Sequence, residues 1–286
     1  MEISRIGSSF AAEVKGLSIK KGIDAGTAAA LEQAIAQFPV LCFRNQRITD
    51  DEQAAFISLF GPMVKNELEE AKSSRVKSTS FVNVTSVDDE GNPLDPQSER
   101  AVYMRANQYW HTDGSPLQPP LRISALSACE LPSDPPVTLF ADMRAAWNAL
   151  PDARKRELEG IQVEHNLVAS RARVGMKMNL DTPAMRSLPR AVVHPLVRTH
   201  RKSGRKSLYL GAHASHVIGR PVTEGSALLE ELVVFATQPQ FVYTHHWEPS
   251  DLLMWDNSCT LHRATPYDRP EPRVLRWASV LELEPV

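Results

Sequence analysis

The chain is organised around one short stretch, which reads Tyr109-Trp110-His111-Thr112-Asp113-Gly114. If His111 ends a β-strand, the alternation of side chains places His111 and Asp113 on one side of the backbone and Thr112 on the other. An imidazole and a carboxylate in that arrangement can bind one metal ion. On its own the pair is a weak signal, because a polar pair in a surface turn produces the same pattern. The prediction therefore depends on a second stretch further along the chain.

The second stretch reads Trp255-Asp256-Asn257-Ser258-Cys259-Thr260-Leu261-His262-Arg263. It follows an apolar run typical of a strand, its Asp-Asn pair favours a turn, and His262 is the candidate third ligand. Two histidines and one carboxylate form a facial triad, which leaves positions open on the metal and suits non-haem Fe(II) oxygenases. Arg273 follows His262 by eleven residues. A guanidinium there suits a dicarboxylate co-substrate, because it pairs with a carboxylate through two parallel hydrogen bonds.

Together these motifs resemble those of the Fe(II)/2-oxoglutarate-dependent dioxygenases of the taurine dioxygenase family. The resemblance is strongest to the 2,4-dichlorophenoxyacetate dioxygenase branch and covers almost the whole chain. It implies a mainly β fold with flanking helices, a double-stranded β-helix (jelly roll, cupin-like), in a single domain spanning residues 1–286. Many predicted strands, few helices and ligands on separate strands fit the same architecture. The further segments that carry the resemblance are Val40–Arg44, Ala106–His111, Ala141–Ala146, Leu196–His200, Gly211–His216 and Leu253–Asn257.

The resemblance also implies a ligand set and a co-substrate site. Fe(II) is expected on His111, Asp113 and His262, with 2-oxoglutarate as co-substrate and O2 as oxidant. The far carboxylate of 2-oxoglutarate is expected to meet Arg273 and the hydroxyl of Thr138. This threonine ends a Pro-Pro-Val-Thr stretch where the family has a glycine-rich turn, so the threonine is retained and the glycines are not.

The implied reaction is the hydroxylation of a small organic acid, coupled to the decarboxylation of 2-oxoglutarate to succinate and CO2. If the hydroxylated carbon bears an ether oxygen, the product collapses and an aryl ether is cleaved. The expected substrate is therefore aryloxyalkanoate-like, and the expected role is the catabolism of aromatic compounds. A sulfonate or other alkyl acid is the alternative within the family. A metal-containing jelly roll that only binds a ligand is the non-enzyme alternative, which loss of a metal ligand or of Arg273 would have favoured.

The sequence departs from this branch at a position that selects the substrate. Many relatives carry a second arginine four residues after the co-substrate arginine, suited to the acid group of the substrate, and this chain has Trp277 there. Arg276 has the opposite strand parity and should point away from the site. One hypothesis is that Arg105 supplies the missing cation, if residues 104–111 form a regular strand; the alternative is that Arg105 is exposed. Another hypothesis is that Trp277 forms a stacking wall for an aromatic or apolar substrate.

Three more side chains are candidates for contact with the bound molecules. Asn107 would share a face of the same strand with His111, from which its amide could hydrogen-bond to co-substrate or substrate. His213 and His216 lie in a segment that carries the resemblance, and they are candidates for the substrate pocket. The remaining histidines lack such spacing, and we expect structural roles for His165, His194, His200, His245 and His246.

Two irregular polar segments are expected near the site. Residues 63–105 and residues 168–190 are predicted to cover it, and the alternatives are a surface loop and a solvated excursion, respectively. The rest of the pattern predicts scaffold. It includes a helix over residues 24–38, a second helix opened by a capping box at Thr49, and a hairpin around Ser203-Gly204.

Composition and charge exclude several classes of protein. The net charge of -2 provides no basic surface for nucleic acid. No apolar run is long enough to span a bilayer, and the first residues lack the pattern of a signal peptide. Cys42, Cys129 and Cys259 are well separated in apolar surroundings, so we expect buried free thiols and a cytoplasmic protein. The expected partner is the small organic acid, and a homo-oligomer is compatible with the family, whose members often self-associate.

Overall fold

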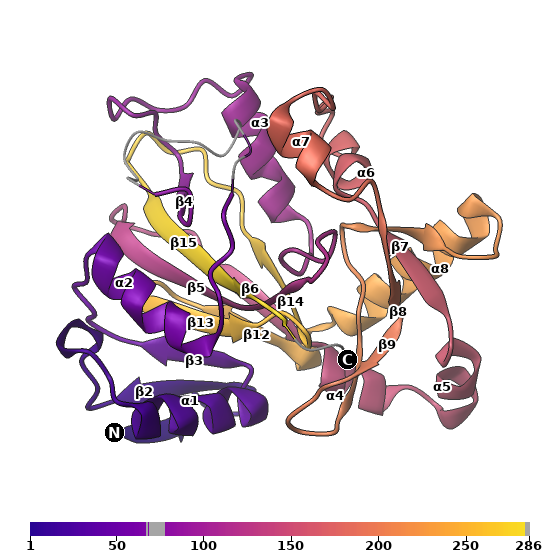
Figure 1. Cartoon of the computed structure of the whole chain (residues 1–286), viewed down its shortest axis with the longest axis horizontal. Coiled ribbons are helices and arrows are strands. Elements are labelled where there is room, and N and C mark those ends of the chain that lie inside the picture. Colours follow the sequence, from indigo (N-terminus) through magenta and orange to yellow (C-terminus); the bar gives the residue numbers. More distant parts are fainter. Residues whose placement is uncertain (67, 69–77, 284–286) are drawn as a thin grey trace.

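The computed structural model describes residues 1–66, 68 and 78–283. Its centre is built from β-sheets, and helices lie around them (Figure 1). The largest sheet contains seven strands and joins segments from both ends of the chain. Their order is β1 (Glu2–Arg5), β2 (Ala11–Lys15), β3 (Val40–Phe43), β13 (Leu252–Asp256), β5 (Leu121–Glu130), β15 (Val274–Leu281) and β4 (Val82–Thr85).

A second sheet of three strands packs against one face of the first. Phe140 and Tyr243 from the second sheet share a buried apolar cluster with Leu253 and Trp255 from β13. Two sheets that enclose a common core form the mainly β jelly roll that the sequence predicts. The order of the second sheet is β12 (Val242–His245), β6 (Thr138–Asp142) and β14 (Thr260–Ala264).

The seven-stranded sheet is buried on both of its faces. In β13, Leu253 contacts the second sheet, whereas Met254 contacts the opposite layer, because successive side chains point to opposite faces. That opposite layer contains the helices α1 (Ala25–Gln37) and α2 (Asp50–Ile57), at the lower left of Figure 1. Burial on both faces explains why the central strands read as continuous apolar runs rather than as alternating patterns.

These two helices begin where the sequence predicts. The Asp24 carboxylate accepts a hydrogen bond of 2.6 Å from the backbone N–H of Thr27 at the start of α1. Thr49 and Glu52 form the reciprocal capping box of α2. The predicted hairpin is also present, as the antiparallel pair β9 (Val197–Thr199) and β10 (Lys206–Leu208).

A separate core holds the elements from the middle of the chain. It contains Trp147 of α4 (Met143–Ala149), Val163 of β7 (Gln162–His165) and Leu229 of α8 (Val222–Ala236). Leu261 of β14 belongs to the same core and so links it to the second sheet. The other elements of this part are α5 (Asp152–Leu158), α6 (Leu167–Ala172), α7 (Pro183–Ser187), β8 (Val192–Pro195) and β11 (Ala214–Val217).

The strand predicted over residues 104–111 is wrong. The chain is helical there, first as α3 (Glu99–Arg105) and then as one 3-10 turn. The Ser98 hydroxyl opens α3 by accepting a hydrogen bond from the backbone N–H of Ala101. This N-cap satisfies a backbone donor that a strand would have left for a neighbour, so it favours the helix. No strand face is therefore shared between Arg105 and His111.

The cysteines follow their prediction in part. All three are free thiols, and Cys42 and Cys259 are buried. Cys129 is exposed, because the last two residues of β5 lie on the surface. In the described part of the chain, the helices are too short or too polar to cross a membrane.

Candidate metal centre and co-substrate pocket

Two histidines face one another across neighbouring backbone segments. His111 donates its backbone N–H to the His262 carbonyl at 3.0 Å, and His262 returns the bond at 2.8 Å. Residues that exchange both bonds in an antiparallel pair direct their side chains to the same face. The two rings accordingly lie with their centroids 4.2 Å apart. The backbone pairing brings residues 151 positions apart in the sequence to one point.

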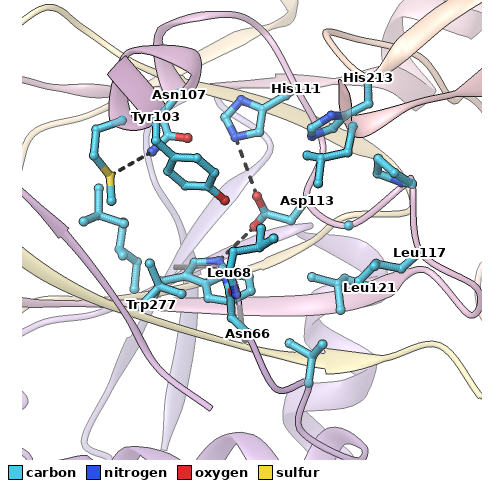
Figure 2. Close-up of a pocket in the computed structure, with 18 of the residues that line it drawn as sticks. Asn66, Leu68, Tyr103, Asn107, His111, Asp113, Leu117, Leu121, His213 and Trp277 are labelled. Carbon is cyan, nitrogen blue, oxygen red and sulfur yellow. Dashed lines mark hydrogen bonds and ion pairs between the residues drawn. The ribbon is translucent and has the colours of Figure 1, made fainter. Parts of the chain in front are cut away.

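The Asp113 carboxylate completes this group, and its two oxygens have different neighbours. Oδ1 lies 3.6 Å from His111 Nε2 and 3.5 Å from His262 Nε2. Oδ2 accepts hydrogen bonds from the Ser124 hydroxyl at 2.7 Å and from the Trp277 indole N–H at 3.0 Å. Figure 2 shows the carboxylate between His111 and Trp277. Oδ1 therefore stays available on the side of the imidazoles, while Oδ2 is held in place.

Asn257 fastens the two stretches that carry these residues. Its side-chain oxygen accepts from the Asp113 backbone N–H at 3.1 Å and from the Trp255 indole N–H at 3.0 Å. Its amide nitrogen donates to the Ser124 hydroxyl at 2.8 Å. Its backbone carbonyl accepts from the Thr112 hydroxyl at 2.7 Å. The sequence indicates Asn257 only as a turn residue, so its function as the link between the two halves of the site was not predicted.

The protonation states of the two histidines and of Asp113 allow all three side chains to direct a lone pair to one point. His111 Nδ1 donates to the Tyr109 carbonyl at 2.8 Å, so Nε2 carries the lone pair. Burial lowers the pKa of His111 and that of His262, the latter to about 3. Burial raises the pKa of Asp113. The two imidazoles and the hydrogen bonds from Ser124 and Trp277 lower this pKa by more than burial raises it, so it lies below its ordinary value. Two neutral imidazoles and a carboxylate at neutral pH fit a divalent first-row metal such as iron.

These donors open onto a cavity of about 240 Å³ that also contains a buried cation. Arg273 lines it, is 7% exposed, and has no hydrogen-bond partner for its Nε among the residues that the structure describes. Burial lowers the pKa of Arg273 to about 10, so the side chain remains charged at neutral pH. A buried, unpaired guanidinium is costly unless an anion joins it. The cavity therefore fits a ligand with a carboxylate.

Thr138 lines the same cavity with its hydroxyl proton uncommitted. Its oxygen accepts a hydrogen bond of 3.0 Å from the Trp247 indole N–H. This bond uses a lone pair of the hydroxyl and leaves its proton for a second acceptor. Trp247 is therefore a positioning residue that the sequence did not indicate, because 109 residues separate it from Thr138.

A family model matches residues 2–278, and it is described as the taurine catabolism dioxygenase TauD, TfdA family. The chain belongs to this family. The predicted family is thereby confirmed.

Relatives of this dioxygenase cover nearly its whole length. It is 41% identical to the alpha-ketoglutarate-dependent 2,4-dichlorophenoxyacetate dioxygenase of Burkholderia sp. (strain RASC), over 95% of this chain and 91% of the relative. It is 32% identical to the (S)-phenoxypropionate/alpha-ketoglutarate-dioxygenase of Sphingobium herbicidovorans, over 99% of this chain and 96% of the relative. The crystal structure of AAD-2 in complex with Mn(II) and N-oxalylglycine superposes with a TM-score of 0.90 at 38% identity, covering 100% of this chain and 99% of the other. These likenesses confirm the predicted fold.

Trp277 does more in the dioxygenase than form the stacking wall that the sequence suggests. It lines the cavity, as a stacking wall would, but its only N–H is donated to Asp113. Arg276 points away from the cavity, as its strand parity predicts, and binds Gln53 and Asp50 instead. Trp277 thus orients the carboxylate of the candidate metal centre as well as bounding the cavity.

Arg105 lies away from the cavity, which corrects the hypothesis that it supplies a substrate cation. Its guanidinium donates to the backbone carbonyl of Pro96, and it is not among the lining residues. The cause is the helical turn described above, which directs Arg105 to a different side from Asn107. Asn107 does line the cavity, and its amide donates weakly to the sulfur of Met104 at 3.8 Å.

The two histidines of the 211–216 segment separate in the same way. His213 lines the cavity, with its ring centroid 6.2 Å from that of His111 (Figure 2). His216 is half-buried beside Glu164, 3.8 Å away, and is not among the lining residues. The placement of His216 corrects its prediction as a pocket residue, because β11 pairs it with Glu164 of β7 and the two side chains share one face of that sheet.

Residues from both predicted cover segments reach the cavity. Leu68, Tyr103, Met178 and Met185 belong to one apolar cluster that joins the segments 63–105 and 168–190. Figure 1 shows α3, α6 and α7 gathered together at the top of the molecule. Of the first segment, residues 67 and 69–77 lie outside the described residues.

Proposed function

We propose that this dioxygenase hydroxylates a small aryloxyalkanoate-like organic acid, using Fe(II), 2-oxoglutarate and O2. The observation that carries the proposal is the meeting, in one cavity, of the free donors of His111, Asp113 and His262 with the unpaired guanidinium of Arg273. The named activities of the relatives that are 41% and 32% identical support the substrate class.

The three donors would hold Fe(II) on one face and leave the opposite face for the other reactants. When bound, the iron and 2-oxoglutarate supply the oxidation of a substrate C–H bond by O2, with release of succinate and CO2. Ser124 and Trp277 keep Asp113 Oδ2 occupied, so that Oδ1 alone faces the metal position. Asn257 keeps the two halves of the site in register.

Arg273 and Thr138 would bind the far carboxylate of 2-oxoglutarate. Charge-assisted hydrogen bonds of this kind contribute roughly 1.5–3 kcal/mol each. The Thr138 hydroxyl can donate because Trp247 supplies the bond that it accepts. The distance between the two carboxylates of the co-substrate would then decide which atoms of it reach the metal.

We further propose that the chain forms a single catalytic domain in which residues 63–105 and 168–190 cover the site. Apolar side chains from both segments support this, because they would exclude water from the reacting centre. If oxidation occurs at a carbon that bears an ether oxygen, the resulting hemiacetal collapses to a phenol and a carbonyl compound. Such a step suits the catabolism of aromatic compounds, and the free thiols of Cys42 and Cys259 fit a reducing cytoplasm.

The test is succinate release from 2-oxoglutarate by the enzyme reconstituted with Fe(II) and ascorbate. The panel contains phenoxyacetates, 2-phenoxypropionates, taurine, alkyl sulfates and short alkyl acids. We expect stimulation by phenoxy acids, with stoichiometric phenol release. Stimulation by sulfonates or sulfate esters alone would replace the substrate class, and failure to bind 2-oxoglutarate would overturn the reaction itself.

A further inference from the structure

A second buried guanidinium faces the cavity and is not used by the reaction described above. Arg171, in the last turn of α6, lines the same cavity as Arg273. It is 8% exposed, and its Nε has no hydrogen-bond partner in the described part of the chain. Within residues 1–66, 68 and 78–283 it forms no ion pair. Its position cannot be explained by a structural salt bridge with any of these residues.

Arg171 is held in position by an aromatic ring rather than by a carboxylate. Its guanidinium carbon lies 4.3 Å from the ring centroid of Tyr103, which comes from α3 and also lines the cavity. The contact joins the two cover segments directly above the site. A ring face attracts the cation but accepts few of its five N–H groups, so donors remain for a ligand.

The charges around the cavity require a second anion. Its described lining contains the cations of Arg171, Arg273 and Lys65, against the single carboxylate of Asp113. Asp113 is directed to the metal position, and Arg273 to the co-substrate. Lys65 is exposed, so water solvates its ammonium group. Arg171 is the buried cation that remains without a counter-charge among these residues.

The neighbours of Arg171 cannot serve the same anion. The Ser170 hydroxyl donates its one proton to the Leu167 carbonyl at 2.8 Å, so His213 donates to Ser170 from Nδ1 and keeps a lone pair on Nε2. An acceptor nitrogen does not bind a carboxylate. Trp277 has already donated its N–H to Asp113.

We propose that Arg171 recognises the acid group of the substrate and thereby determines that the dioxygenase acts on organic anions. The apolar residues Leu68, Leu117 and Leu121, visible in Figure 2, lie on the cavity wall where the aryl body of such an anion would rest. The proposal rests on the function proposed above and names the residue behind its substrate class. It also gives the segment 168–190 a function in recognition, beyond the exclusion of water.

The test compares Arg171→Met and Arg171→Lys with a control variant, Arg105→Met. Methionine keeps an apolar stem over Tyr103 and removes the charge, and lysine keeps the charge but not the planar fork. Arg105 lies outside the cavity, where its guanidinium donates to the Pro96 carbonyl, and it is the cation that one hypothesis from the sequence assigned to the substrate acid. Each enzyme is assayed for succinate release with the best acid of the panel and with the neutral amide of that acid.

For Arg171→Met we expect KM for the acid to rise roughly tenfold to a hundredfold, because charge-assisted bonds are lost. KM for the neutral amide should change less than twofold, so the preference for the acid collapses. Arg171→Lys should recover part of the loss, and Arg105→Met should match the wild type. An equal loss for acid and amide, or an unchanged KM for the acid, would overturn the assignment.

Binding of N-oxalylglycine in the presence of Mn(II) separates this outcome from failure of the proposed function. Arg171→Met should bind it as tightly as the wild type and unfold at the same temperature, since Arg273 supplies that site. If the wild type binds N-oxalylglycine but turns over a sulfonate or sulfate ester, the aryloxyalkanoate class fails, and the same variants test Arg171 with that acid. If no acid stimulates turnover while neutral compounds do, the assignment of Arg171 fails with the acid class.

Discussion

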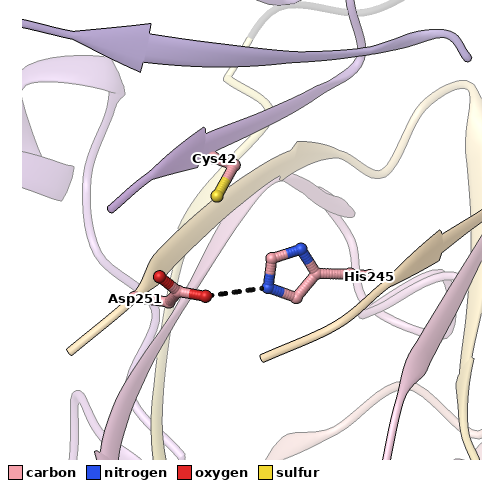
Figure 3. Close-up of side chains that lie close together, drawn as sticks. All are labelled: Cys42, His245 and Asp251. Carbon is pink, nitrogen blue, oxygen red and sulfur yellow. Dashed lines mark hydrogen bonds and ion pairs between the residues drawn. The ribbon is translucent and has the colours of Figure 1, made fainter. Parts of the chain in front are cut away.

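Two buried groups in this molecule have nearly the same composition and opposite characters. His111, Asp113 and His262 form the candidate metal centre, and a second group consists of Cys42, His245 and Asp251 (Figure 3). In the second group His245 Nε2 donates to Asp251 Oδ2 at 3.1 Å, and Nδ1 accepts from the Tyr243 hydroxyl at 3.0 Å. In the first group the imidazole Nε2 atoms lie 3.5 and 3.6 Å from the carboxylate oxygen, beyond a hydrogen bond.

The difference lies in the hydrogen bonds of the imidazoles and in their access to the cavity. His245 and Asp251 are 0% exposed. Both ring nitrogens of His245 form hydrogen bonds, and the bond to Asp251 links β12 to the start of β13. The metal-centre imidazoles are each 8% exposed and face the cavity with free lone pairs. A third group, of His200, Asp256 and Cys259, follows the structural pattern, since His200 Nε2 donates to Asp256 at 3.0 Å. Composition alone does not separate these cases.

The largest effect is expected from replacing one histidine by alanine in each of the first two groups. His262→Ala should abolish metal binding and succinate release, because two ligands do not complete the facial set. His245→Ala should retain Mn(II) binding and lower the free energy of unfolding by roughly 1–3 kcal/mol, because Tyr243 and Asp251 lose a buried partner. Calorimetric titration with Mn(II) and urea unfolding measure the two quantities. Loss of metal from His245→Ala without loss of stability would show that the two groups are not distinct in this way.

A pair of buried arginines extends the comparison to cations. Arg273→Met should raise KM for 2-oxoglutarate at least tenfold, while the protein without co-substrate keeps or gains stability, since an unpaired buried charge is removed. Arg144 is also buried, but it is paired with Asp142 and donates to the Ala36 carbonyl. Arg144→Met should therefore lower the free energy of unfolding by roughly 3–5 kcal/mol. Thermal unfolding with and without N-oxalylglycine reads both effects, and equal destabilisation by both substitutions would contradict them.

Trp277→Phe tests whether the carboxylate of the metal centre needs its second donor. The substitution keeps an aromatic ring on the cavity wall and removes the bond to Asp113 Oδ2. We expect metal affinity to fall roughly tenfold, as for other hydrogen bonds that orient a metal ligand. Trp147→Phe, in the core that α4 shares with α8, controls for the lost indole volume. An unchanged Mn(II) affinity together with a changed KM for the organic acid would assign Trp277 to the substrate alone.

A further effect concerns acid stability at the third group. Burial raises the pKa of Asp256, but hydrogen bonds and the charge of His200, with further bonds from Ser258, hold it at about 2. A carboxylate whose pKa is depressed in the folded state stabilises the fold above its ordinary pKa and loses that contribution as the pH falls. At pH 7 the free energy of unfolding of the wild type should exceed that of Asp256→Asn by about 2 kcal/mol. This difference should disappear as the pH falls from about 5 to about 2. Urea unfolding across this pH range measures the difference in free energy of unfolding. A difference that does not change with pH would contradict a depressed pKa of Asp256 in the folded state.

Local signals in the sequence were sufficient to predict much of the scaffold, and the family resemblance indicated the residues of the candidate metal centre. Capping residues such as Asp24 and Thr49 act within one helical turn, so their consequences can be read without knowledge of the rest of the chain. The pairing of His111 with His262 could be expected because the family resemblance links the two motifs. The error at residues 104–111 arose where alternation was read as a strand although Ser98 offered an N-cap.

Side-chain pairings between distant segments were decided only by tertiary packing. The bond of Trp247 to Thr138, the bond of Trp277 to Asp113 and the ring contact of Arg171 with Tyr103 join residues 109, 164 and 68 positions apart. Such contacts depend on how sheets and helices pack, and each polar atom is satisfied by whichever partner the fold brings near. The amino-acid sequence thus specified which chemical groups the protein carries and where helices such as α1 and α2 begin. The packed structure decided which of those groups remain unsatisfied and face the cavity, and unsatisfied groups are the ones that bind a ligand.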